Sequence, residues 1–268
     1  MRLSTPAREV IRLWIYFVAS LIGLGAGVLG SMFGLGGGFL IVPLLNIAGV
    51  DIRVAVGTSA SAIFFNMLSS TIAYSRYKYV VYEAGALLSA TAVVTAYFGA
   101  QLTKVLNPDL LRVVFGVVLV LVGLRMMISA SSDKVSEKTA VRWGLRNYVV
   151  LLLGGCLAGF IAGLLGVGGG VVNVPLLTSL GFLMHYAVAT SAMAITITSV
   201  TSALTHHTLG NVDLVLLASL TPPLVIGAQI GALIAKKTKS VTLKRGFVVV
   251  LWVIAARMVL KGLGFNIP

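Results

Sequence analysis

Gly34-Leu-Gly-Gly-Gly-Phe-Leu-Ile-Val-Pro-Leu-Leu45 returns in the second half of the chain as Gly166-Val-Gly-Gly-Gly-Val-Val-Asn-Val-Pro-Leu-Leu177. Both copies lie within strongly apolar sequence. A glycine cluster followed by a proline interrupts a helix, and in a membrane such a break is tolerated only where protein or water covers the freed backbone groups. A duplicated break of this kind is typical of a transporter built from two halves, with its binding site where the halves meet.

The composition indicates an all-α polytopic membrane protein. The chain is 58% hydrophobic and 10% charged, with a mean hydropathy of +1.04, whereas soluble domains carry about 25% charged residues. The net charge of +13 would suggest a nucleic-acid partner in a soluble protein. Here the Lys and Arg residues lie mostly between apolar runs, as at membrane interfaces. The sequence therefore predicts a multi-pass protein of the cell membrane that binds lipid and no nucleic acid.

Each half contains five apolar segments. They cover residues 13–33, 35–49, 54–74, 84–103 and 110–128, and then 148–165, 167–182, 187–206, 213–235 and 243–262. A spanning helix needs about 20 residues, but Gly38–Gly49 would be about 18 Å long as a helix. The expected architecture is two homologous halves, each with about four spanning helices and one short broken or re-entrant segment.

The boundary between the halves lies in the most polar stretch of the chain. We predict an N-terminal transmembrane repeat over 1–128, a linker loop over 129–147 and a C-terminal transmembrane repeat over 148–268. The repeat extends beyond the glycines, since Ala55–Ala60 resembles Ala187–Ala192 at the same offset.

A further match aligns Gly99-Ala-Gln101 with Gly227-Ala-Gln229 after a small shift in the intervening loop. This alignment pairs the two glutamines.

Basic loops predict the membrane orientation. The linker and the loop 236–245 are rich in Lys and Arg, which places both in the cytoplasm, whereas 207–212 has neither and is expected outside. If each short segment is a crossing of its own, each half has five crossings and the halves are inverted. If the short segments merge with their neighbours, the halves are parallel. We favour the inverted arrangement, although it leaves the basic N-terminus outside.

The glycine clusters are the first candidates for a binding site. Glycine lets backbone approach a ligand closely, and the start of a half-helix presents free N–H groups and a positive dipole end. Two such ends form an anion site, although close helix packing is the alternative. The predicted substrate-binding glycines are Gly36, Gly37, Gly38, Gly168, Gly169 and Gly170.

Hydroxyl and amide side chains near the glycines are the second candidates. Thr58, Ser59, Thr190 and Ser191 could donate to an anion, or cap a helix and bond back to the preceding turn. Gln101 and Gln229 could bind substrate or join helices by interhelical hydrogen bonds.

Few ionisable groups lie in the apolar segments. Arg125 and Arg257 are related by the repeat and could attract an anion, or extend to the interface. His206 and His207 could relay protons, or form an interfacial pair. No HExxH, Walker A or Ser–His–Asp pattern is present, so the sequence predicts neither an enzyme nor a bound metal or cofactor.

The pattern Gly-x-Gly-Gly-Gly-x-x-x-Val-Pro-x-Leu in both halves, followed by Ala-x-x-Thr-Ser, resembles the sulfite exporter TauE/SafE family, also called the toluene sulfonate uptake permease family. The resemblance covers nearly the whole chain. It implies secondary transport of small sulfur-containing anions such as sulfite, sulfoacetate or other organosulfonates. Alternating access around the glycine sites, with or without proton coupling, would be the mechanism.

Other functions share much of this logic. A carrier or channel for another small anion or metabolite would use the same site, and a membrane subunit would need a partner to act. Helix faces rich in small residues also allow a homodimer. Saturable flux with counterflow separates a carrier from a channel.

Overall fold

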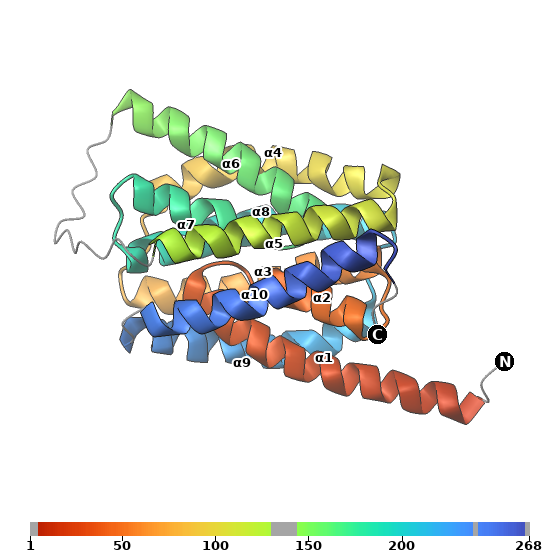
Figure 1. Cartoon of the computed structure of the whole chain (residues 1–268). Helices are drawn as coiled ribbons and strands as arrows, with labels where there is room; N and C mark the ends of the chain where they lie inside the picture. The colour runs from red at the N-terminus through yellow and green to blue at the C-terminus, as the bar shows by residue number, and fades with distance from the viewer. Residues whose placement is uncertain (1–4, 130–143, 238–240, 266–268) are drawn as a thin grey trace.

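The computed structural model describes residues 5–129, 144–237 and 241–265. These residues form ten α-helices and no strand (Figure 1). The helices of the first half are α1 (Thr5–Phe33), α2 (Gly38–Ile47), α3 (Ile52–Arg76), α4 (Tyr82–Val105) and α5 (Pro108–Ser129). Those of the second half are α6 (Leu145–Leu165), α7 (Gly170–Ser179), α8 (Met184–Thr208), α9 (Leu214–Lys237) and α10 (Val241–Gly262).

Two of these helices are short, as the sequence predicts. α2 and α7 have ten residues each, and both begin directly after a glycine in the left-handed conformation. A glycine is needed there because a side chain at positive φ is strained. Both helices contain a proline, Pro43 or Pro175, at the sixth position. The predicted short segments are therefore confirmed as separate helices.

The helices of the two halves are interleaved. α1 packs chiefly against α9, and α4 against α6. A Cβ added at Gly23 in α1 would lie 2.6 Å from the carbonyl oxygen of Leu220, and one at Gly231 in α9 would overlap the carbonyl of Val28. Because the residue numbers of these contacts rise together along the two helices, α1 and α9 run parallel. Small residues let the two backbones approach this closely.

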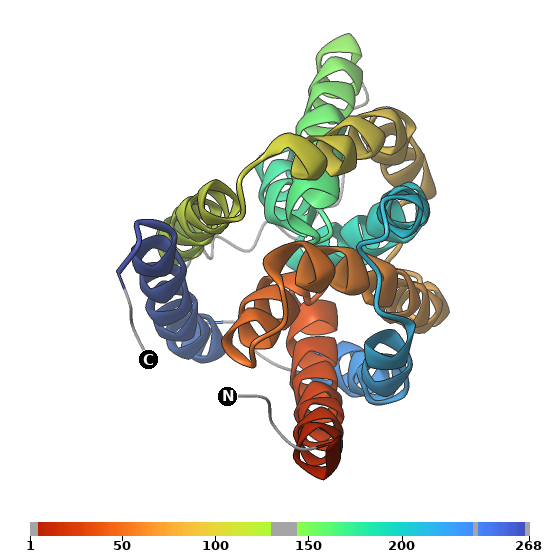
Figure 2. The same ribbon diagram turned by 90° about the vertical axis from the view of Figure 1, so that its right-hand side faces the viewer.

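The remaining pairs complete the bundle. α3 and α8 pack against each other in the centre, next to α2 and α7. α5 and α10 lie side by side at one edge, as the view along the helices shows (Figure 2). Gly116 faces Val259 and Gly262 faces Val113, so this last pair runs antiparallel.

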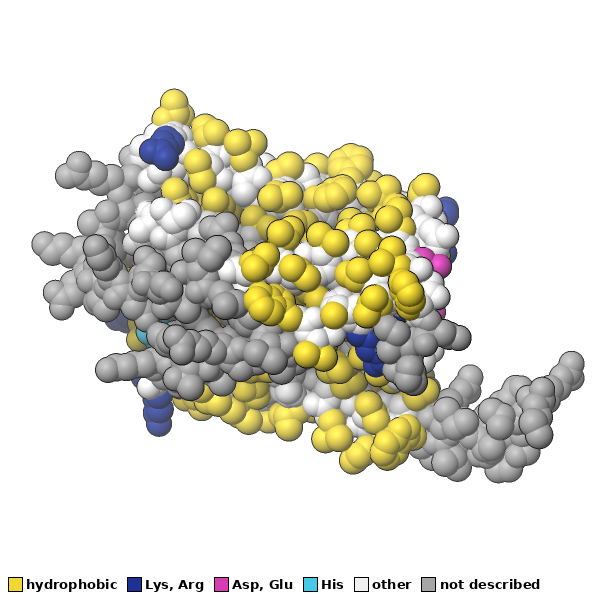
Figure 3. All heavy atoms as spheres, viewed as in Figure 1, with side chains coloured by type: hydrophobic (Ala, Val, Ile, Leu, Met, Phe, Trp, Pro, Cys, Tyr) yellow, Lys and Arg dark blue, Asp and Glu magenta, His cyan; other side chains and the backbone are white. Residues whose placement is uncertain are grey.

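The outer surface is suited to lipid. Among the described residues, six helices are long and apolar enough to cross a membrane. They are α1 from Trp14, α3, α4, α6, α8 and α9. Large hydrophobic side chains on their outer faces are exposed, and in Figure 3 the charged side chains of the visible face gather toward the two ends of the helices. Examples of these exposed side chains are Trp14, Phe17, Phe98, Leu153, Leu204 and Ile226. The chain is a multi-pass integral membrane protein.

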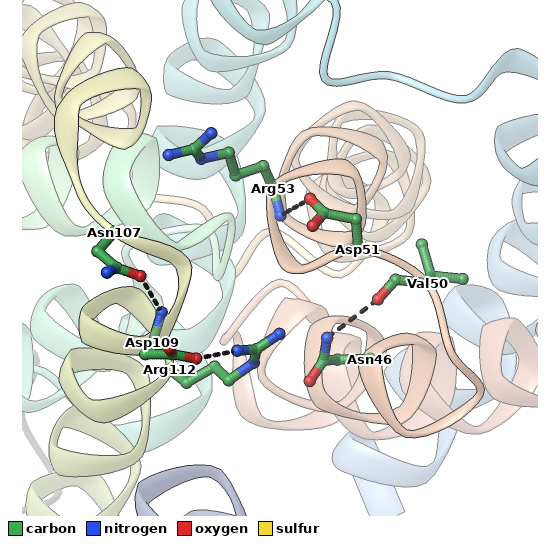
Figure 4. Close-up of polar contacts among 7 residues, drawn as sticks. All are labelled: Asn46, Val50, Asp51, Arg53, Asn107, Asp109 and Arg112. Atoms are coloured by element: carbon green, nitrogen blue, oxygen red, sulfur yellow. Dashed lines mark hydrogen bonds and ion pairs between the residues drawn. The ribbon is translucent and has the colours of Figure 1, made fainter. Parts of the chain in front are cut away.

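Polar contacts hold the connection between α2 and α3 (Figure 4). Asn46 donates its amide to the carbonyl of Val50 at 3.0 Å, and the Asp51 carboxylate accepts from the backbone N–H of Arg53 at 2.8 Å. A carboxylate in this position caps the helix that follows. The Arg53 guanidinium donates to the carbonyl of Leu106 at 2.7 Å, which ties the start of α3 to the turn between α4 and α5.

The neighbouring start of α5 is held in a similar way, also seen in Figure 4. Asn107 accepts from the backbone N–H of Asp109 at 3.0 Å, and Asp109 pairs with Arg112 one turn later. These contacts fix the end of the bundle at which α2 ends.

We expect Gly23→Ala to destabilise the protein by about 1–3 kcal/mol, because its methyl group would force α1 away from the Leu220 carbonyl. The measurement is thermal denaturation of the purified protein in detergent, which should show a melting temperature lower by several degrees.

Gly25→Ala is the matched control in the same helix. An added Cβ at Gly25 meets nothing within 4 Å, and alanine is the better helix former, so its melting temperature should be unchanged or higher. Equal destabilisation by both substitutions would contradict the close approach of α1 to α9 at Gly23.

Candidate functional site

The two glycine clusters meet in the middle of the protein. A Cβ added at Gly38 would overlap the carbonyl oxygen of Gly166, and one at Gly170 would overlap the carbonyl oxygen of Gly34. Gly38 and Gly170 are equivalent positions of the sequence repeat, and so are Gly34 and Gly166. Each half therefore makes the same contact with the other half. We call the segments 34–38 and 166–170 together the glycine crossing.

Glycine is required here for conformation as well as for space. Gly36 and Gly37 have φ values of 96° and 91°, and Gly168 and Gly169 have 89° and 70°. An L side chain rarely adopts this region. All six glycines predicted to bind substrate belong to the glycine crossing, which brings the starts of α2 and α7 together.

Serine hydroxyls attach the glycine crossing to the central helices. Ser59 in α3 donates to the carbonyl of Gly166, and Ser191 in α8 donates to the carbonyl of Gly34, both at 2.9 Å. Both serines are completely buried. Each half therefore supplies the hydrogen bond that satisfies a buried glycine carbonyl of the other half.

The neighbouring threonines accept hydrogen bonds from the segments that precede α9 and α4. The Thr58 hydroxyl accepts from the backbone N–H of Asp213 just before α9, and the Thr190 hydroxyl accepts from the N–H of Val81 just before α4, both at 3.0 Å. Like the two serines, each threonine thus bonds to the opposite half of the chain. Direct substrate binding by these four side chains stays a prediction.

His206 is a buried structural partner. It is completely buried, and its Nε2 lies 2.8 Å from the carbonyl of Gly163. The equivalent contact in the first half is made by the Tyr74 hydroxyl, which donates to the carbonyl of Ser31 at 2.9 Å. A histidine and a tyrosine therefore tie the ends of α6 and α1 to the central helices. His207 is exposed, and proton coupling through either histidine stays a prediction.

The two glutamines are not equivalent, which corrects the repeat alignment. A Cβ at Gly99 would overlap the carbonyl of Phe160, and the same contact is made in the other half by Gly231 on Val28. Gly99 thus corresponds to Gly231 and not to Gly227. Because α4 and α9 begin at the same offset as the two glycine clusters, the shift assumed from the sequence does not exist.

The surroundings of the glutamines differ accordingly. Gln229 donates to the Ser69 carbonyl at 2.9 Å and contacts the Ser69 hydroxyl, joining α9 to α3. Gln101 lies half-buried in α4. Gln229 therefore makes the interhelical hydrogen bond that was the alternative to substrate binding.

The two repeat-related arginines belong to helices outside the glycine crossing. Arg257 is half-buried in α10, which packs on α5. The side chain of Arg125 lies outside the described residues. In the described part of the chain, no three His, Cys, Asp or Glu side chains gather into a group that could hold a metal ion.

A small cavity adjoins the glycine crossing, and the sequence did not predict any of the hydroxyl side chains that line it. Its volume of about 10 Å³ has room for about one water molecule. Hydroxyls of α8 line it at Thr198, Ser199 and Ser202, together with Gly168. The available signal was the run of Thr and Ser in α8, whose members at positions 198/199 and 202 share one helix face.

Comparison with known proteins identifies the family. The sequence model of the family "Sulfite exporter TauE/SafE" matches residues 19–258. This chain belongs to the TauE/SafE family. The match spans the glycine crossing and nine of the ten helices in full or nearly so, so it agrees with the resemblance seen in the doubled glycine motif.

Curated relatives cover nearly the same length. The "Probable membrane transporter protein YunE" of Bacillus subtilis is 31% identical over 270 residues, covering 92% of this chain and 98% of the relative. A protein of Methanocaldococcus jannaschii with the same general name is 28% identical, covering 81% and 85%. One from Haemophilus influenzae is 27% identical, covering 90% and 97%. No solved structure matches this chain. This TauE/SafE protein is accordingly a membrane transporter.

We expect Ser59→Ala to lower the stability by about 1–3 kcal/mol, because it leaves the buried Gly166 carbonyl without its hydroxyl donor. Thermal denaturation in detergent measures the effect.

Ser61→Ala is the control in the same helix. The Ser61 hydroxyl is also buried but donates to the carbonyl of Gly57 in its own helix, so its loss should change the melting temperature much less. If Ser61→Ala were as destabilising as Ser59→Ala, the hydrogen bond from Ser59 to Gly166 would contribute no more to stability than a bond within the helix.

Proposed function

We propose that this chain is a secondary transporter that moves small sulfur-containing anions, such as sulfite, sulfoacetate or other organosulfonates, across the membrane by alternating access. The observation that carries the proposal is the glycine crossing, where α2 and α7 begin against each other between spanning helices. The first N–H groups of a helix have no intrahelical acceptor, and the N-terminal end of the dipole is positive. Two such ends favour an anion over a cation.

The substrate class comes from the family. The matching family is named for sulfite export, and the relatives are named only as probable membrane transporters. A sulfite or sulfonate group carries several acceptor oxygens, which backbone N–H groups and hydroxyls can satisfy. Binding without a fixed opposite charge is weak enough to favour release, which a transporter needs.

An inverted relation between the halves would fit alternating access, and the directions of the helices support it. α4 follows α3 after a short connection and runs in the opposite direction. α8 runs parallel to α4, since Val81 contacts Thr190 and Gly85 faces Met193. α3 and α8 therefore run in opposite directions, as α5 and α10 do. Equivalent contacts on antiparallel helices support a relation of the halves by an axis in the membrane plane.

The motion proposed is a rocking of the interleaved helix pairs about the glycine crossing. Each pair, α1 with α9 and α4 with α6, takes one helix from either half, so neither half can move as an isolated body. The sequence contains no Walker A motif, and an ion gradient or the gradient of the substrate itself would drive the cycle.

Gly37→Ala should reduce sulfite uptake into proteoliposomes by at least tenfold. An added Cβ would lie 2.7 Å from the carbonyl of Ala26 at a φ of 91° and would displace the start of α2. Radiolabelled sulfite uptake, with and without an imposed pH gradient, measures the effect and shows whether protons are coupled.

Gly49→Ala is the matched control for strain. Gly49 has a nearly identical φ of 95°, but an added Cβ there meets nothing within 4 Å. We expect it to keep most of the flux. Normal flux in Gly37→Ala would move the transport site away from the glycine crossing, and absence of flux in the parent protein would refute the proposed substrate class.

The orientation can be tested by cysteine labelling. We expect Thr208→Cys, at the end of α8, to react with a membrane-impermeant thiol reagent in intact cells, and Lys237→Cys, at the end of α9, to react only after lysis. Both residues are exposed, and the background is Cys156→Ser because Cys156 is exposed as well. Labelling of both positions from the same side would contradict the topology.

A further inference from the structure

The cavity beside the glycine crossing is lined by the central helices α3 and α8, by α6 and by one glycine segment. α8 contributes Ile195, Thr198, Ser199 and Ser202, α3 contributes Ala60 and Ile63, α6 contributes Ala162, and the glycine crossing contributes Gly168. Gly168 lies two residues before the first residue of α7. The cavity therefore adjoins the beginning of a half-helix, where free N–H groups are expected.

One hydroxyl in the cavity has an unused hydrogen-bonding capacity. Ser202 is 2% exposed, and its Oγ has no hydrogen-bond partner. Thr198 donates back to the carbonyl of Ala194 at 2.8 Å, and Ser199 donates back to Ile195. A buried polar atom without a partner costs free energy, which a ligand that accepts from Ser202 would recover.

The corresponding positions of the first half are filled differently. Thr198, Ser199 and Ser202 correspond to Asn66, Met67 and Ser70 in α3. Met67 is fully buried, Asn66 donates to the Gly36 carbonyl at 2.8 Å, and Ser70 donates to the Asn66 carbonyl at 2.9 Å. The hydroxyl-lined cavity is thus a feature of the α8 side.

None of the side chains that line the cavity is charged. Without a cation nearby, the desolvation of a doubly charged ion would go uncompensated, while a single charge spread over several oxygens is less costly to bury.

From these observations we infer that the cavity is a binding subsite for the singly charged, oxygen-bearing head group of the substrate, hydrogensulfite or a sulfonate, with Ser202 as its main hydroxyl donor. This inference rests on the proposed transport function and adds the position and charge state of the bound group. The present volume suits about one water molecule. Binding therefore requires α3 and α8 to separate around Gly168, which is the opening that alternating access demands.

The first test compares Ser202→Ala with Ser70→Ala, its counterpart in the other half. Loss of one hydrogen bond to an ionised ligand should raise the KM for sulfite uptake by about tenfold or more. Ser70→Ala, which removes a hydroxyl bonded only within its own helix, should leave KM unchanged. Sulfite-dependent thermal stabilisation of the purified variants gives an independent reading of binding.

The second test fills the cavity. Ser199→Met introduces into α8 the residue that α3 carries at Met67, and it should abolish sulfite uptake while the protein remains monodisperse in detergent. Methanesulfonate, which carries one charge, should compete with sulfite in the parent protein, and sulfate should not.

The outcomes separate this inference from the proposed function. If the parent protein transports sulfite and Ser202→Ala, Ser70→Ala and Ser199→Met all transport it equally well, the subsite is overturned and the proposed transport function stands. Equal competition by sulfate would overturn the single-charge preference. Absence of both flux and sulfite-dependent stabilisation in the parent would overturn the proposed function and the subsite together.

Discussion

The contact on which this structure depends is the backbone-to-backbone approach of two glycine segments in the middle of the membrane domain. Gly38 lies against the carbonyl of Gly166, and Gly170 against that of Gly34, at a separation that no Cβ would allow. A side chain on either glycine would push α2 away from α7. In a soluble core, large hydrophobic residues determine which segments pack together. Here glycines determine it, because only residues without side chains can approach this closely.

Close backbone approach creates a second requirement, because the freed peptide groups at a helix break inside a membrane need hydrogen-bond partners. Buried side chains of the central helices meet it. Ser59 and Ser191 satisfy the carbonyls of Gly166 and Gly34 from the opposite half, and Asn66 satisfies that of Gly36. The two serine bonds make each half incomplete without the other. The pairing of α1 with α9 and of α4 with α6 extends this mutual dependence to the outer helices.

The repeat is close to symmetric where it builds the scaffold and departs from symmetry where a ligand could be recognised. Tyr74 and His206 differ chemically but make the same kind of contact with a carbonyl near the end of α1 or α6. By contrast, Met67 fills space in α3, while its counterpart Ser199 lines a cavity in α8. A scaffold that needs two matching halves can thus still carry a single recognition site.

The sequence by itself determined the helices and the two breaks in them, because hydrophobic length and glycine conformation act over short distances along the chain. The predicted segment 167–182 contains α7, and the glycines before α2 and α7 do adopt positive φ. Only the tertiary structure decided the partners. Ser59 is 107 residues from Gly166, and Ser191 is 157 residues from Gly34, so no local pattern could distinguish a hydroxyl that binds an anion from one that binds a carbonyl. The pairing of Gln101 with Gln229 was wrong for the same reason, since residue type suggested a match that the packing of Gly99 and Gly231 does not support. The cavity beside Ser202 depends on the volumes of side chains from several elements, which meet only when the chain is folded.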